Sequence, residues 1–150
     1  MRLGDLIAAV PGLRPLTPID PALRVCDITE DSRTAVPNSL FIARPGATSD
    51  GRRYLAQAAA AGAIAAIVQQ AEATPPADPG VPAGLAILES PDAAAAGALL
   101  AEAFYASPSS RLALVGVTGT NGKSTIAHLI HRALNAAGTR TGLIGTVEID

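Results

Sequence analysis

The chain has 150 residues, a net charge of −2 and a hydrophobic content of 49%, with 32 alanines. A chain of this length can bury roughly two-thirds of its surface, and a charged fraction of only 16% argues against intrinsic disorder. An aromatic content of 3% without tryptophan argues against a base-stacking platform, and the slightly negative net charge argues against a nucleic-acid-binding protein.

Cys26 is the single cysteine, which excludes an internal disulfide and a cysteine-based zinc site. Arg2 and Asp5 interrupt the first ten residues, which therefore lack the long apolar core of a signal peptide. No stretch reaches the roughly 18 uninterrupted apolar residues of a membrane span. We therefore expect a cytoplasmic protein without membrane contact, with Cys26 as a buried side chain of a strand.

The chain begins with a predicted helix, because Leu3, Leu6, Ile7 and Val10 are spaced for one apolar helix face. A second helix is predicted over 53–61 from its alanines and from a stripe that includes Tyr54. The proline-rich stretch 72–84 predicts a loop. Apolar runs bounded by turn residues predict strands at 25–29, 39–43, 63–68 and 85–88.

The second half of the chain begins with a strong helix signal. Ser90 is the expected N-cap, and the helix is predicted to run to about Tyr105, where the stretch 107–110 breaks it and predicts a linker. A buried strand at 112–118, a helix over 123–137 and a strand at 141–149 follow.

These elements predict the α/β class and a division into three parts. Residues 1–88 form a small mixed α/β domain, 89–110 form a linker helix and linker, and 111–150 form the first strand–turn–helix–strand unit of a parallel-sheet domain.

The turn before the fourth predicted helix, over 123–137, has the composition of a phosphate-binding loop. Glycines let backbone N–H groups converge on an anion, and a helix N-terminus adds partial positive charge. Lys123 would reach the terminal phosphates, and the Ser124 hydroxyl could bind Mg²⁺. Five residues, not the usual four, separate Gly116 from Gly122, so an ordinary glycine-rich turn is the alternative. The loop residues are Gly119, Thr120, Asn121, Gly122, Lys123, Ser124 and Thr125.

This loop resembles the ATP loop of the Mur ligases and folylpolyglutamate synthetases. The segment 105–123 is similar to the start of the ATP domain in the UDP-N-acetylmuramoyl-tripeptide synthetases, the Mur ligase E family. Upstream, Asp31-Ser32-Arg33, the strand 40–43, Gly46 and Asp50-Gly51 are similar to the uridine-nucleotide-binding domain of that family.

The resemblance implies an ATP-dependent, amide-bond-forming ligase of peptidoglycan synthesis, active in cell-wall biogenesis, cell shape and cell division. It would add a diamino acid to UDP-MurNAc-L-Ala-D-Glu through an acyl phosphate, with ATP and Mg²⁺, as a monomer. The loop 119–125 would hold ATP, with Ser124 on the metal. The UDP-sugar would be contacted by Glu30, Ser32, Ala47, Thr48 and Ser49. The resemblance assigns no catalytic side chain to this chain, and the diamino-acid-selecting residues would lie beyond it, so the chain alone is expected to lack ligase activity.

Three alternative functions accompany this interpretation. They are the sister Mur ligase that adds D-Ala-D-Ala, a stand-alone UDP-sugar or nucleotide-binding module, and an unrelated P-loop NTPase. The Thr120-Asn121 pair and the strand at 142–148 favour the Mur ligase E family over the sister ligase.

Several of the site residues also have a purely structural interpretation. Asp31-Ser32-Arg33 could be a solvated turn with a local ion pair. His128 and His131 have a metal-pair spacing, but they fall on the polar face of their predicted helix, so we expect a solvated face. Where the family commonly has Gly-Asp, this chain has Asn38-Ser39, and asparagine tolerates the left-handed backbone that such a turn uses.

Overall fold

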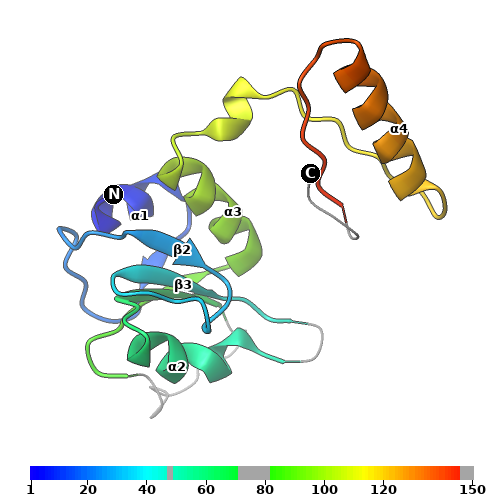
Figure 1. Cartoon of the computed structure of the whole chain (residues 1–150). Helices are drawn as coiled ribbons and strands as arrows, with labels where there is room; N and C mark the ends of the chain where they lie inside the picture. The colour runs from blue at the N-terminus through cyan, green and yellow to red at the C-terminus, as the bar shows by residue number, and fades with distance from the viewer. Residues whose placement is uncertain (47–48, 71–81, 146–150) are drawn as a thin grey trace. The chain divides into compact units, whose positions relative to one another are not determined.

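The computed structural model describes residues 1–46, 49–70 and 82–145. The chain divides into two compact units, Met1–Arg111 and Leu112–Asp150 (Figure 1).

A mostly parallel sheet forms the centre of the first unit. Within the described residues it has five strands in the order β1-β5-β4-β3-β2. Strands β2 to β5 are mutually parallel, and β1 adds to one edge in antiparallel orientation. The predicted mixed α/β fold is therefore confirmed for this unit. The bounds are β1 Arg14–Pro15, β2 Asp27–Thr29, β3 Ser39–Ala43, β4 Ala65–Gln69 and β5 Ala86–Ser90.

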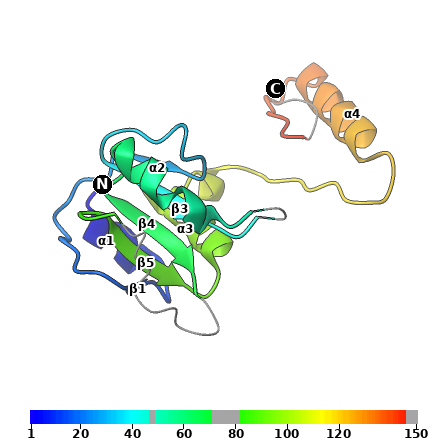
Figure 2. The ribbon, with the colours of Figure 1, turned by 90° about the horizontal axis from the view of Figure 1, so that it is seen from below.

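Helices cover both faces of this sheet (Figures 1 and 2). Helices α1 (Leu3–Ala9) and α3 (Ala93–Phe104) pack on one face, and α2 (Leu55–Ala60) with the short 3-10 helix η1 (Gly51–Tyr54) packs on the other. Successive residues of a strand point to opposite faces, so Leu40 and Ile42 join the first core while Phe41 and Ala43 join the second. All five residues of β3 are buried for this reason.

Helix α3 belongs to the core of the first unit, although the sequence division placed it in the linker. Leu100 is 1% exposed and packs with α1 and the sheet. The compact unit accordingly extends to Arg111. The expected cap is wrong: the N-cap is Asp92, whose carboxylate accepts from the Ala95 amide at 2.9 Å. Ser90 instead ends β5, and its hydroxyl bonds to the backbone of Asp92.

Two other expectations concern the approach to β3. Cys26 is exposed rather than the buried strand residue that was expected, and its Sγ donates to the Pro37 carbonyl oxygen at 2.9 Å. Asn38 has a φ of 66°, so the left-handed turn expected for an asparagine at this position is confirmed.

Two glycines allow close packing next to the end of β3. A Cβ on Gly97 of α3 would lie 2.8 Å from Ile42 Cδ1, and a Cβ on Gly51 would lie 2.7 Å from the Arg44 carbonyl oxygen. The absence of side chains there lets α3 and η1 approach the strand from its two faces.

The second unit contains helix α4 (Lys123–Ala136), close to its predicted bounds. The strand predicted at 112–118 is absent. Of the strand predicted at 141–149, residues 141–145 form no named strand, and 146–149 lie outside the described residues. A strand requires a hydrogen-bonded neighbour, and the described residues of this unit provide no paired strand. The apolar side chains of Leu112, Leu114 and Val115 are consequently 63–76% exposed.

No helix in the described ranges has both the length and the apolar character needed to cross a membrane.

Candidate functional site

A pocket of about 290 Å³ opens where β2 and β3 end. Glu30 directly follows β2, and Arg44 directly follows β3, so both lie at the carboxyl edge of parallel strands. This edge is where open α/β sheets bind their ligands. The residues lining the pocket are Glu30, Phe41, Ile42, Arg44, Gly46, Ser49, Gly51 and Tyr54.

An ion pair links the two strand ends at this pocket. Arg44 Nε donates to Glu30 Oε2 at 2.7 Å, and both side chains are about half exposed. Among the described residues, the remaining guanidinium donors of Arg44 have no protein acceptor. Because the pair is open to solvent, it contributes little to stability, about 0–1 kcal/mol. The ion pair holds the Arg44 guanidinium at the pocket.

Backbone hydrogen bonds close the loop that follows β3. The Gly51 amide donates to the Arg44 carbonyl oxygen at 3.1 Å, and the Gly46 amide donates to the Ser49 carbonyl oxygen at 2.9 Å. Asp50 accepts from the Arg52 amide and caps η1. The base of the loop is therefore fixed on the sheet.

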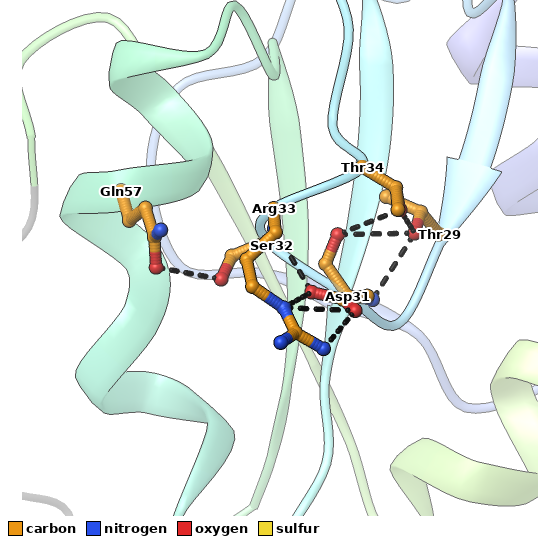
Figure 3. A network of polar contacts seen from close by, with 6 residues as sticks. All are labelled: Thr29, Asp31, Ser32, Arg33, Thr34 and Gln57. Carbon is orange, nitrogen blue, oxygen red and sulfur yellow. Dashed lines mark hydrogen bonds and ion pairs between the residues drawn. The ribbon is translucent and has the colours of Figure 1, made fainter.

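The turn after β2 contains the local ion pair that the structural interpretation anticipated. Arg33 Nη2 lies 2.7 Å from Asp31 Oδ2 (Figure 3). Hydrogen bonds from the Arg33 side chain, and then from its backbone amide, lower the pKa of Asp31 from 3.8 to about 2. The same contacts raise the pKa of Arg33. Thr29 and Thr34 bond to each other at 2.8 Å and to the backbone of Asp31, so the turn is rigidly held.

Ser32 differs from its neighbours because it is only 6% exposed. Its hydroxyl donates to Gln57 Oε1 at 2.8 Å and ties the turn to α2 (Figure 3). Of the sequence-predicted UDP-sugar residues, Glu30 and Ser49 line the pocket and Ser32 supports the turn beside it. Ala47 and Thr48 lie outside the described residues.

Sequence reasoning missed Arg44 and Tyr54. Tyr54 was assigned to an apolar helix stripe, but it is 42% exposed and lines the pocket. For Arg44 a signal existed: it is the first charged residue after the buried strand 39–43, at the edge where parallel strands present polar side chains.

The glycine-rich loop of the second unit leads directly into α4. Gly122 is the N-cap with a φ of 75°, and no side chain caps the helix. The Lys123 ammonium donates to the Gly119 carbonyl oxygen at 2.6 Å and lies 3.4 Å from that of Thr120. An uncapped helix N-terminus, an adjacent cation and open space at Gly122 fit a phosphate chemically.

Among the described residues of this unit, few side chains could bind a metal. Ser124 is exposed in the first turn of α4 and could supply one hydroxyl ligand. The described residues contain no group of three or more His, Cys, Asp or Glu side chains that could hold a metal. His131 is half-buried, with its Nδ1 3.0 Å from Thr141 Oγ1, so this part of the helix is less solvated than expected.

Comparison with known families identifies the class of protein. Residues 25–105, more than half of the chain, match the family described as "Mur ligase family, catalytic domain", and 117–150 match the "Mur ligase middle domain". The chain belongs to the Mur ligase family.

Among individual relatives, the chain is 44% identical over 146 residues to the UDP-N-acetylmuramoyl-L-alanyl-D-glutamate--2,6-diaminopimelate ligase of Chlorobium phaeobacteroides. This match covers 97% of the chain and 28% of the relative. The ligase of the same name from Listeria monocytogenes is 35% identical, over 98% of the chain and 28% of the relative. The chain thus spans about 28% of the length of these curated relatives.

Solved structures support the fold. A crystal structure of MurF from Acinetobacter baumannii matches with a TM-score of 0.66 at 24% identity, over 91% of this chain and 28% of that one. The MurF ligase of Thermotoga maritima, solved in complex with ADP, matches with a TM-score of 0.50 at 21% identity, over 76% and 24% of the two chains.

Proposed function

We propose that this chain is the substrate-binding and ATP-loop portion of a ligase that adds a diamino acid to UDP-MurNAc-L-Ala-D-Glu in peptidoglycan synthesis. The observation that carries the proposal is 44% identity over 97% of the chain to a relative with that printed function. Because the chain spans only 28% of that relative, it would act as part of the ligase. Its relatives' names favour 2,6-diaminopimelate as the diamino acid and disfavour the D-Ala-D-Ala sister activity.

The first unit would bind the UDP-sugar in the pocket at the ends of β2 and β3. Glu30 and Ser49 line this pocket, and Ser32 sits in the adjoining turn, so three of the five expected contact residues gather around one edge of the sheet. Ala47 and Thr48 belong to the same loop in the sequence and are part of the proposal.

The second unit would bind ATP on the loop 119–125. Lys123 would exchange its hydrogen bond with the Gly119 carbonyl for the phosphates, and the Ser124 hydroxyl would be one ligand of Mg²⁺. ATP, when bound, would phosphorylate the D-glutamate carboxylate with release of ADP, and the amine of the diamino acid would then displace phosphate. A monomeric, cytoplasmic protein, as expected from the sequence, is part of this proposal.

Calorimetry with UDP-MurNAc-L-Ala-D-Glu tests the first unit. We expect saturable heat and a rise in melting temperature, because a ligand that binds only the folded state stabilises it. Neither heat nor a thermal shift would contradict the assignment of the pocket.

A fluorescent ATP analogue tests the loop. Lys123→Ala should weaken binding at least about tenfold, because hydrogen bonds to charged groups contribute about 1.5–3 kcal/mol. Arg132→Ala removes one positive charge from the same helix and serves as the control, with binding expected to stay near that of the wild type. An equal loss of affinity in Lys123→Ala and Arg132→Ala would show that Lys123 acts only through its positive charge and makes no specific contact with the phosphates.

Ligase turnover is a separate test. With ATP, the UDP-sugar and diaminopimelate, we expect no phosphate release from this chain, because it spans only 28% of its relatives. Robust turnover would refute that expectation.

A further inference from the structure

Resting on the proposed function, we propose that Arg44 is the residue that recognises the diphosphate of the nucleotide sugar and that Glu30 positions it. Both residues line the pocket, and each is the first residue after its strand. Among the described residues that line the pocket, Arg44 is the one cation and Glu30 the one anion.

The backbone of Arg44 is held in place by η1. The Gly51 amide donates to its carbonyl oxygen at 3.1 Å. A Cβ on Gly51 would lie only 2.7 Å from the same oxygen, so the two segments are in close contact. The root of the Arg44 side chain therefore cannot shift without moving the η1 segment.

Glu30 holds the other end of the side chain. It accepts from Arg44 Nε at 2.7 Å. An arginine held through Nε keeps its planar guanidinium in a fixed orientation and leaves the Nη donors for a second acceptor. The Arg44 side chain is about half exposed, and within the described residues its Nη atoms have no protein partner.

Tyr54 suits the uncharged part of such a ligand, because it lines the pocket and is 42% exposed. Phe41 and Ile42 also line the pocket, but their side chains are buried in the cores on the two faces of the sheet. An exposed aromatic residue next to a single oriented guanidinium matches a nucleoside joined to phosphate, because a base can stack on an aromatic ring and arginine binds phosphate oxygens in a bidentate manner.

Glu30 has two opposing effects on this recognition. Its hydrogen bond orders the guanidinium, which favours binding, while its negative charge repels the diphosphate. Glutamine keeps an acceptor for Arg44 Nε and removes the charge, whereas alanine removes both. A positioning role therefore predicts that Glu30→Gln binds a diphosphate at least as tightly as the wild type, and that Glu30→Ala binds it several-fold more weakly than Glu30→Gln.

The experiment compares uridine, UMP and UDP by calorimetry on the full chain and its variants. Arg44→Gln should weaken UDP binding by about 10- to 100-fold and leave uridine within about twofold, as expected for loss of a charge-assisted hydrogen bond. Arg44→Lys keeps the charge but loses the planar fork, so its UDP affinity should lie between those of the wild type and Arg44→Gln. Arg14→Gln is the matched control, because Arg14 is an exposed arginine on β1, at the opposite edge of the sheet from β2.

The roles of Arg44 and Glu30 can fail while the chain still binds the UDP-sugar. Equal weakening of uridine and UDP by Arg44→Gln, or unchanged UDP binding, would overturn the role of Arg44. Equal UDP affinity in Glu30→Ala and Glu30→Gln would overturn the positioning role of Glu30. A wild-type chain that binds neither UDP nor UDP-MurNAc-L-Ala-D-Glu would overturn the proposed function itself.

Discussion

Leu100→Ala is the substitution that most directly tests whether α3 is part of the first unit. Leu100 is 1% exposed and packs in the core cluster that contains Leu3 and Leu6 of α1 and Leu88 of β5. Truncation to alanine removes apolar atoms from a closed environment and leaves a cavity between α3, α1 and the sheet. A helix serving only as a linker would tolerate the same change.

The expected cost follows from this burial. Leu→Ala changes in cores lower the free energy of unfolding by about 2.7–5 kcal/mol. Domains of this size are stable by only about 5–15 kcal/mol. With a urea m-value of about 1–3 kcal/mol/M, the unfolding midpoint should fall by about 1–5 M.

Tyrosine fluorescence is a suitable probe because it reports on the first unit alone. The chain has no tryptophan, and its two tyrosines, Tyr54 and Tyr105, both lie within Met1–Arg111. Leu99→Ala is the matched control, since Leu99 is the adjacent leucine of the same helix and is 46% exposed. Its cost should stay below about 1 kcal/mol. Equal midpoints for the two variants would refute the packing of α3 described above.

Three further predictions follow from individual contacts. Gly97→Ala should change the free energy of unfolding by less than about 1 kcal/mol, because Ile42 Cδ1, 2.8 Å from the new Cβ, is the end of a flexible side chain that can rotate away, and the gain in helix propensity of about 1 kcal/mol offsets the remaining crowding; a loss of about 3 kcal/mol or more in urea unfolding would contradict this. The Asp31 carboxyl should titrate near 2 by NMR and return toward 3.8 in Arg33→Gln. Because the pKa of Asp31 is depressed in the folded state, the stabilisation from the Asp31–Arg33 pair is present above the unfolded pKa and is lost as the pH falls toward 2. An unchanged Asp31 titration in Arg33→Gln would exclude Arg33 as the cause of the depressed pKa. Ser39→Ala should leave stability unchanged or raise it by up to about 1 kcal/mol, since within the described residues the buried Ser39 hydroxyl has no hydrogen-bond partner; a clear loss of stability in thermal unfolding would show that the hydroxyl is bonded.

Local sequence signals were sufficient where an element carries its own pattern. The strand Ser39–Ala43 was predicted with its observed bounds, because a short apolar run between turn residues favours a strand buried on both faces. Helix α4 was predicted to within one residue at its end, because its apolar stripe and the glycine after it mark one amphipathic helix.

Tertiary packing decided what these local patterns left open. The alanines of α3 define a helix but hardly distinguish one face from another, so only its contacts with α1 and the sheet show that it belongs to the core. The run 112–118 has the apolar pattern of a strand, yet a strand forms only when a neighbour supplies its hydrogen bonds, and the described residues of that unit supply none.

The sequence by itself determined strands β2 to β5 of the first sheet, the glycine-rich loop before α4 and the family resemblance that those motifs carry, but it did not predict β1. Only the tertiary structure joined Glu30 to Arg44, which are 14 residues apart in the chain. Pairing of β2 with β3 sets Thr29 opposite Phe41, so both strands end at the same edge of the sheet and Glu30 comes within hydrogen-bonding distance of Arg44. No local pattern encodes this contact, because it depends on which strands become neighbours and in which register they pair.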